Sequence, residues 1–231
     1  MELIRQQVTL LGAWVDAPDK ILPFIEIIGR TCYKSEERIT DVSAAGFVRM
    51  LINRGHEAML EHVSITAKFV TDRGISHELV RHRIASYAQE STRYVNYTKP
   101  GVADNGVRFI DPSEAFGWKP QSILRFHLAK DCEYSETAYK TMMASGAKPE
   151  QARQVLNQAL ATEINMTANL REWRHFLTLR CAPVAHPLMR ELALQTLQMM
   201  HSLVDVVFDD LYQEYFPTPQ ELSPVSLTVT N

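Results

Sequence analysis

The most informative segment of the sequence is Arg81-His82-Arg83-Ile84-Ala85-Ser86-Tyr87-Ala88-Gln89-Glu90-Ser91-Thr92-Arg93, which holds three arginines, a histidine and two serines. The chain as a whole has a formal net charge of -3. An acidic chain that gathers cations in one short segment is typical of a protein that binds an anion there. Guanidinium groups bind phosphate with fixed bidentate geometry, and nearby hydroxyls complete the oxygen shell. A solvated basic face paired with local carboxylates is the alternative interpretation.

The spacing within this stretch predicts more than one anion. Arg81 and Arg83 are two residues apart, so on a helix they would point in different directions. That arrangement suits two anions, such as a nucleotide monophosphate and a dinucleotide pyrophosphate. Ser91 and Arg93 are also two apart, and in an extended segment they would project on one side and share a phosphate.

The order of residues in the stretch resembles the signature of the flavin-dependent thymidylate synthases. A stringent form of that family's pattern is RHRxxSxNxxSxR, and residues 81–93 match six of its seven fixed positions. The departure is Ala88, where the family often has Asn. The resemblance runs from about Ile28 to Arg190, with the central motif highly specific and the flanking matches individually weak.

Composition sets limits that fit an ordinary enzyme. The 231 residues are enough for one large domain with a buried core, and 45% hydrophobic with 22% charged residues are globular values. No apolar stretch approaches the roughly 20 residues needed to cross a bilayer, and the N-terminus lacks the pattern of a secretory signal. The three cysteines, Cys32, Cys132 and Cys181, are far apart and form no metal-binding pair. We therefore expect a cytoplasmic protein that binds no membrane and no metal.

The order of predicted elements indicates a mixed α/β (α+β) chain with strands early and helices late. We expect strands at Gln7–Trp14, Glu61–Thr71 and Phe109–Ile110. The second of these alternates apolar and polar residues, which is the pattern of a half-buried strand. Helices are expected at 21–33 and 42–53, at a short segment around 75–82, along a long stripe from Leu124 to Met142, from Pro149, and over 189–211. The chain should form a single catalytic domain over 1–216, with a polar tail at 217–231.

Any nucleotide must be held largely by side chains. The sequence contains neither Gly-x-Gly-x-x-Gly nor Gly-x-x-x-x-Gly-Lys-Ser/Thr, so Rossmann and P-loop interpretations are poor. The family resemblance implies the flavin-dependent thymidylate synthase fold, an antiparallel-rich sheet with several long helices. It also implies a homotetramer whose active sites are built between subunits.

The resemblance assigns one group of residues to the flavin. His56 would sit beside the flavin or folate, although a lone histidine in such a place is more often structural. Ala58 stands where relatives often have Thr or Ser, so a contact there would come from its backbone. Glu78 stands where the family often has Gln, which weakens its predicted contact with the nucleotide. The residues that would contact FAD are Ala58, Arg81, His82, Arg83, Gln89, Asn169, Leu170, Arg171 and His175.

The resemblance assigns a second, overlapping group to dUMP. Arg153 lies three and seven residues before Leu156 and Leu160, on the edge of an apolar helical stripe, where an arginine is costly to bury without an anionic partner. By resemblance it binds the nucleotide from a different subunit; a solvated helix edge is the alternative. The substrate-binding residues would be Glu78, Arg81, Gln89, Glu90, Ser91, Thr92, Arg93, Arg153 and Arg180.

Arg180 is the predicted catalytic residue. It aligns with a family arginine proposed to pair with uracil and favour its ionised N3 form, and the charge raises the nucleophilicity of C5. The resemblance implies reductive methylation of dUMP to dTMP without a protein thiol. Methylenetetrahydrofolate would supply the one-carbon unit, and hydride would pass from NADPH to the nucleotide by way of FAD. Cys181 is adjacent to Arg180 in the sequence, but one neighbouring cation is weak evidence that a cysteine acts as a nucleophile.

Two alternatives come from other classes of protein. A non-catalytic nucleic-acid-binding module would use the Arg81–Arg93 cluster for phosphates and Tyr94 and Tyr97 for stacking, against which the net acidity counts. A metal hydrolase would use His56, Glu57 and His62, but their spacing is not His-Glu-x-x-His.

Overall fold

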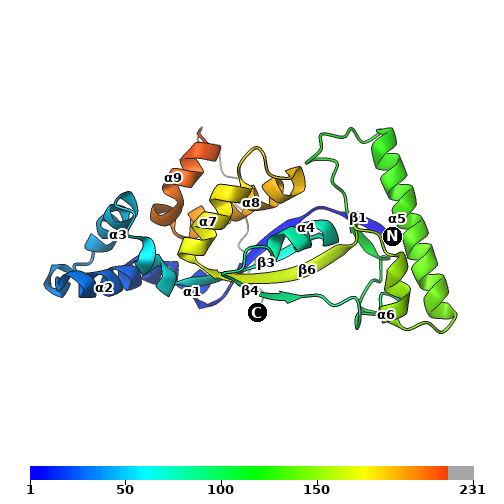
Figure 1. Cartoon of the computed structure of the whole chain (residues 1–231), viewed down its shortest axis with the longest axis horizontal. Helices are drawn as coiled ribbons and strands as arrows, with labels where there is room; N and C mark the ends of the chain where they lie inside the picture. The colour runs from blue at the N-terminus through cyan, green and yellow to red at the C-terminus, as the bar shows by residue number, and fades with distance from the viewer. Residues whose placement is uncertain (218–231) are drawn as a thin grey trace. The chain divides into compact units, whose positions relative to one another are not determined.

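The computed structural model describes residues 1–217 of the chain (Figure 1). These residues form two compact units, and each is described by itself. The first unit comprises residues 1–7, 69–82 and 87–165, and the second comprises 8–68, 83–86 and 166–217 of the described residues. The single catalytic domain over 1–216 stays a prediction, and the tail expected at 217–231 lies outside the described residues except for Pro217.

Two nine-residue strands are the centre of a four-stranded sheet, β3 (Ser64–Asp72) and β6 (Ala161–Asn169). The strand order is β2-β3-β6-β4, where β2 is Gln7–Leu11 and β4 is Ser86–Gln89. The Leu170 N–H donates to the Val63 carbonyl, and the Thr66 and Thr167 hydroxyls are hydrogen-bonded at 2.8 Å. Residue numbers therefore rise on one strand as they fall on the other, which makes the pair antiparallel.

Both long strands end in a side chain that starts a helix. At the end of β3 the Asp72 carboxylate accepts the Ile75 N–H at 2.6 Å, and α4 (Arg73–Leu79) follows. At the end of β6 the Asn169 amide oxygen accepts the Glu172 N–H at 2.9 Å, and α7 (Leu170–Arg180) follows. Each cap satisfies a backbone donor that the first helical turn leaves unpaired. The strand ends thus fix where the Arg81 stretch and helix α7 begin.

Helices supply most of the core of the second unit. They are α1 (Ala13–Asp16), α2 (Ile21–Tyr33), α3 (Ser43–Asn53), α7, α8 (Pro187–Leu203) and α9 (Asp205–Tyr215), with a 3-10 segment, η3 (Glu57–His62). Trp173 on α7 is fully buried, and its indole N–H donates to the Ile65 carbonyl on β3 at 3.0 Å. This bond joins the helix to the strand through a buried donor and a buried acceptor, both satisfied.

The core of the first unit lies between short strands and a long helix. Strand β1 (Glu2–Ile4) pairs in parallel with β5 (Arg108–Ile110). The 22-residue α5 (Ile123–Ala144) is followed by α6 (Pro149–Ala152) and the 3-10 turn η4 (Arg153–Val155). Buried side chains of these elements and of residues beside the strands include Val107, Phe109, Cys132, Tyr139 and Leu160. Among residues 1–217, no helix combines the length and apolar character that a membrane span requires.

The mixed α/β class, with an antiparallel sheet and several long helices, is confirmed. Helix α2 has the predicted bounds, and α3 begins one residue later than expected. In β3 the alternation is as predicted, since Val63, Ile65, Ala67 and Phe69 are buried. The short helix α4, the strand fragment β5 and the helix that begins at Pro149 are confirmed as well.

Four expectations about elements are wrong. The single helix over 189–211 is two helices, because Val204 between them has φ -152° and ψ 80° and cannot continue a helix. The first strand ends at Leu11, and residues 13–16 form a helical turn instead. Leu124, expected on the buried stripe of α5, is 52% exposed. Arg153 lies on no apolar helical stripe, since α6 ends at Ala152 and Leu156 is extended.

Replacing Trp173 tests the link between α7 and β3. Trp173→Phe removes the indole donor and leaves the Ile65 carbonyl buried without that partner. We expect the free energy of unfolding to fall by about 2 kcal/mol, from the lost hydrogen bond and the small cavity together. Urea unfolding measures it, with Trp118→Phe as the matched control because Trp118 is only half-buried. Equal stabilities of the two variants would contradict this role for Trp173.

Candidate active site

The residues predicted for ligand binding fall into two groups, one in each unit. In the first unit lie Glu78, Arg81, His82, Gln89, Glu90, Ser91, Thr92, Arg93 and Arg153. In the second unit lie His56, Ala58, Arg83, Asn169, Leu170, Arg171, His175 and Arg180. Most of the predicted nucleotide contacts are therefore in the first group, and most of the predicted flavin contacts are in the second.

Arg81 follows α4 in a turn rather than on a helix. Its N–H donates to the Glu78 carbonyl, and the His82 N–H donates to the Leu79 carbonyl. The Tyr87 hydroxyl is within hydrogen-bond distance of two carbonyl oxygens, that of Leu79 at 2.8 Å and that of His82 at 2.7 Å. His82 is buried, whereas Arg81 and Arg83 are exposed. The two guanidinium groups are therefore accessible to a ligand, as the pattern predicts for anion-binding residues.

The side-chain amide of Gln89 makes two hydrogen bonds to neighbouring elements. Its Nε2 donates to the Ser76 hydroxyl at 3.0 Å and to the Thr162 hydroxyl at 3.2 Å. Arg73 donates to the same Thr162 hydroxyl and to the Glu90 carbonyl, both at 3.3 Å. Gln89 thus already joins β4 to α4 and β6, and a contact of Gln89 with FAD or dUMP stays a prediction.

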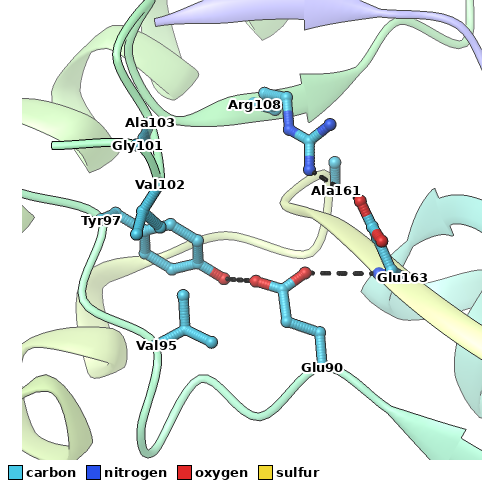
Figure 2. A pocket seen from close by; sticks show the side chains of 9 residues that line it. All are labelled: Glu90, Val95, Tyr97, Gly101, Val102, Ala103, Arg108, Ala161 and Glu163. Atoms are coloured by element: carbon cyan, nitrogen blue, oxygen red, sulfur yellow. Dashed lines mark hydrogen bonds and ion pairs between the residues drawn. The ribbon is translucent and has the colours of Figure 1, made fainter. Parts of the chain in front are cut away.

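Glu90, predicted to contact dUMP, has its carboxylate turned toward other residues of the first unit (Figure 2). One oxygen accepts the Tyr97 hydroxyl at 2.6 Å, and the other accepts the Glu163 N–H at 3.3 Å. Arg108 forms an ion pair with Glu163 at 3.1 Å. These residues line a cavity of about 380 Å³ together with Val95, Gly101, Val102, Ala103 and Ala161. Glu90 therefore fastens the end of the Arg81–Arg93 stretch to β6.

Ser91, Thr92 and Arg93 form a turn, so the expected extended segment is wrong. The N–H groups of Tyr94 and Val95 both donate to the Ser91 carbonyl, at 3.0 and 2.9 Å. Ser91 and Arg93 are exposed, and Thr92 is buried. The turn keeps the predicted phosphate-binding hydroxyl and guanidinium at the surface even though the backbone is not extended.

Arg153 approaches this turn from a distant part of the chain. Its Nη1 donates to the Thr92 hydroxyl at 3.3 Å. Arg93 pairs with Glu150 at 3.2 Å, with side chains 59% and 42% exposed. An exposed ion pair contributes little to stability and is easily exchanged for another anion. Ser91, Arg93 and Arg153 therefore form a cationic, hydroxyl-bearing surface within one unit.

The second group is organised around the turn after α3. Gly55 ends the helix with φ 69°, a left-handed conformation that favours glycine, and the His56 N–H returns to the Leu51 carbonyl. His56 is exposed, and its Nδ1 is hydrogen-bonded to the Tyr33 hydroxyl at 2.8 Å. Ala58, on the same turn, is also exposed. His56 is thus oriented by a partner and remains accessible.

Helix α7 presents the remaining residues of this group. Arg171 and His175 are four apart and exposed, so they share one face of the helix. Arg180 is the last residue of the helix and is half-buried. Leu170 is fully buried, and Asn169 caps the helix, so their side chains serve the fold.

Neither group contains a cysteine, and the histidines and glutamates of the two groups form no metal-binding cluster within residues 1–217. Among the described residues, no three His, Cys, Asp or Glu side chains are placed to hold a metal ion. Burial raises the pKa of Cys181 to about 12, although the charge of Arg190 opposes the shift. A thiol with that pKa is almost entirely protonated at neutral pH and is a poor nucleophile.

Sequence reasoning missed Arg73, Glu163 and Arg174, which organise these groups, and it predicted Tyr97 only as a stacking residue. Arg174 lies three residues after Arg171 on α7, and that helical spacing was the available signal. Glu163 belongs to the alternation of β6, with Thr162, Ile164 and Met166 buried. Arg73 and Tyr97 act through partners far apart in the sequence, which no local pattern indicates.

Tyr97 gives a test of the Glu90 contact. Burial, together with the charge and hydrogen bond of Glu90, raises the pKa of Tyr97 well above its ordinary value of 10. Above about pH 10 unfolding therefore releases a proton, and the wild-type free energy of unfolding should fall by up to about 1.4 kcal/mol per pH unit relative to Tyr97→Phe. At neutral pH the variant should be about 2 kcal/mol less stable, because it loses a hydrogen bond to a carboxylate.

Urea unfolding between pH 7 and pH 11 measures both effects. Tyr94→Phe, which removes the hydroxyl of a 75% exposed ring, is the control. Parallel pH profiles for the wild type and Tyr97→Phe would contradict the buried Tyr97–Glu90 contact.

Comparison with known proteins identifies the family. The family model described as "Thymidylate synthase complementing protein" matches residues 15–204. A flavin-dependent thymidylate synthase from Geobacter sulfurreducens is 32% identical over 193 residues, covering 80% of each chain. One from Mycobacterium bovis is 31% identical over 216 residues, covering 85% of this chain and 82% of the relative.

A solved structure is similar in fold. It is a UMP/dUMP methylase, PolB from Streptomyces cacaoi, bound with 5-Br dUMP; the TM-score is 0.70, the identity is 23%, and the match covers 95% of this chain and all of the other. The resemblance predicted from residues 81–93 is therefore confirmed. The chain belongs to the thymidylate synthase complementing protein family, whose matched relatives are flavin-dependent thymidylate synthases.

Proposed function

We propose that the protein methylates dUMP to dTMP, with methylenetetrahydrofolate as the one-carbon donor and with FAD reduced by NADPH. The observation that carries this proposal is the match of residues 81–93 to the family signature within a family match over 15–204. The arrangement of exposed cations in both units supports it.

The first unit suits the phosphate of a nucleotide. Ser91 supplies a hydroxyl, and Arg93 and Arg153 supply guanidinium groups that reach the same turn. Phosphate can displace Glu150 from Arg93, because that ion pair is exposed and weak. We assign these three residues to binding the phosphate of dUMP, and Ser91 acts as a ligand rather than as a nucleophile. The predicted contacts of Glu78 and Thr92 belong to the same proposal.

The exposed residues of the two groups suit FAD. In the second unit, Arg83 and Arg171 are exposed and can bind the pyrophosphate, while His56 and His175 offer exposed rings. Arg81 of the first unit is exposed as well, and its contact with FAD is proposed from the family motif alone. The donor set is therefore cationic and aromatic, as a flavin dinucleotide requires. When bound, FAD supplies the redox chemistry, accepting hydride from NADPH and passing it on toward the nucleotide.

Arg180 is the residue proposed to assist the chemistry. It ends α7, where the negative end of the helix dipole favours a positively charged side chain. Placed against the uracil ring, the guanidinium stabilises negative charge on the pyrimidine and raises the nucleophilicity of C5. No protein thiol is needed in this route, and the raised pKa of Cys181 supports that view.

The proposal includes a homotetramer with shared active sites. Large apolar side chains are exposed beside the predicted site residues; Ile84 is 72%, Tyr94 75% and Val184 95% exposed. Exposed apolar and aromatic side chains of this kind are typical of interfaces between subunits. A cytoplasmic location likewise stays a prediction.

The nucleic-acid-binding alternative is less well supported. Its two stacking residues were Tyr94 and Tyr97, and Tyr97 is only 8% exposed with its hydroxyl bound to Glu90. A base cannot stack on a buried ring, so this surface would retain a single aromatic platform. Membership of an enzyme family also favours catalysis.

The direct test is formation of dTMP by the purified protein. dUMP, methylenetetrahydrofolate, NADPH and FAD are incubated with the wild type and with Arg180→Ala, and nucleotides are separated by chromatography. We expect the wild type to form dTMP and the variant to retain bound flavin while losing at least about 100-fold in turnover, as when one charge-stabilising donor is removed.

Arg38→Ala is the matched control, because Arg38 is 73% exposed and its ion pair with the neighbouring Glu37, at 3.6 Å, is exposed as well. Wild-type protein that holds FAD but forms no dTMP would contradict the proposed function. Full turnover by Arg180→Ala would contradict the role of Arg180 alone.

A further inference from the structure

Arg174 is a half-buried arginine on α7 whose guanidinium is shared between two acidic side chains. Its side chain is 11% exposed. Nε donates to the Glu57 carboxylate at 3.3 Å, while Nη1 and Nη2 donate to the two oxygens of Asp210 at 2.8 and 2.7 Å. Nη1 also donates to the Val207 carbonyl. All four residues belong to the second unit.

One set of contacts reaches the turn that carries His56. Glu57 is the first residue of η3 and the next residue after His56. The Tyr33 hydroxyl is hydrogen-bonded to the His56 ring, so both His56 and Glu57 have a side-chain partner. Arg171 reaches the same turn, with an ion pair to Glu61 and a 4.0 Å approach to Glu57.

The other set of contacts reaches α9. The Arg174–Asp210 pair is bidentate, which fixes the plane of the guanidinium as well as its position. Burial would raise the pKa of Asp210, but the hydrogen bonds and charge of Arg174 outweigh it and hold this pKa below its ordinary value. With its plane fixed by α9, the guanidinium presents Nε to Glu57 in one direction only.

We propose that Arg174 is a positioning residue which, through Glu57, fixes the His56 turn relative to helix α7. The contact sets the position of His56 relative to Arg171 and His175, the residues of α7 assigned above to FAD. Arg174 therefore sets flavin affinity without touching the flavin, and this inference rests on the proposed function. A lysine could not replace it, because a single ammonium group cannot satisfy Glu57 and the bidentate Asp210 together.

Variants of the two acidic partners of Arg174 distinguish a positioning role from a purely stabilising one. Glu57→Ala removes the contact of Arg174 with the His56 turn, whereas Asp210→Asn weakens only the contact of Arg174 with α9. Each variant is measured for the dissociation constant of FAD, by flavin fluorescence on titration, and for its urea unfolding midpoint. We expect Glu57→Ala to weaken FAD binding about tenfold, the loss of one charge-assisted hydrogen bond.

Asp210→Asn keeps one acceptor oxygen for Arg174 and leaves the Glu57 contact in place, so it should lower the unfolding midpoint and change the FAD dissociation constant less than about twofold. Glu57→Gln, which keeps an acceptor oxygen for Nε, should recover part of the affinity. Adding Arg174→Met to Glu57→Ala should weaken FAD binding no further than Arg174→Met alone, because both changes break the same contact. Glu114→Ala removes a carboxylate that is 62% exposed and serves as the charge-matched control.

Unchanged FAD affinity in Glu57→Ala, with the wild type binding FAD, would overturn the positioning role and leave the proposed function standing. Equal loss of affinity in Glu57→Ala and Asp210→Asn, in proportion to their loss of stability, would also overturn it. A wild type that binds no FAD would instead overturn the proposed function and this inference with it.

Discussion

The antiparallel pairing of β3 with β6 is the constraint on which the rest of the structure depends. The Thr66–Thr167 hydroxyl pair and the bond from Leu170 N–H to the Val63 carbonyl set the register of the two strands. Each strand then ends in an Asx side chain that caps the following helix, Asp72 for α4 and Asn169 for α7. A slip of one residue would reverse the faces of the strand and misplace both helices. The register therefore fixes where both groups of candidate site residues begin.

Burial divides the arginines near these groups by role. Arg73 and Arg174 are partly buried, and each donates hydrogen bonds to partners from separate elements. Arg81 and Arg93 are exposed, which leaves their charge available to an anion. A buried guanidinium needs partners to offset its desolvation, so the first kind orders the scaffold. The exposed kind suits ligand binding, because a phosphate can replace water or a weak surface partner.

Hydrophobic periodicity predicted the helices and strands that are buried on one face and exposed on the other. The 13-residue helix α2 and the strand β3 have clean apolar faces, and both were predicted from the sequence. Strand β6 alternates too, but small and polar residues such as Ala161 and Thr162 stand at its buried positions, which weakens the signal. The break at Val204 carries neither glycine nor proline to mark it. The motif predicted the candidate site, whereas the contacts of Tyr97 and Arg174 depend on tertiary packing that local patterns do not report.

The most direct measurement is the visible absorption spectrum of the purified protein, taken before and after anaerobic NADPH, with and without dUMP. The family match predicts a bound oxidised flavin, and the exposed Arg83, Arg171, His56 and His175 of the second unit fit that prediction. We expect its absorption to bleach with NADPH, which would establish the reductive half of the reaction. A protein with no flavin spectrum, even after incubation with FAD, would contradict the account.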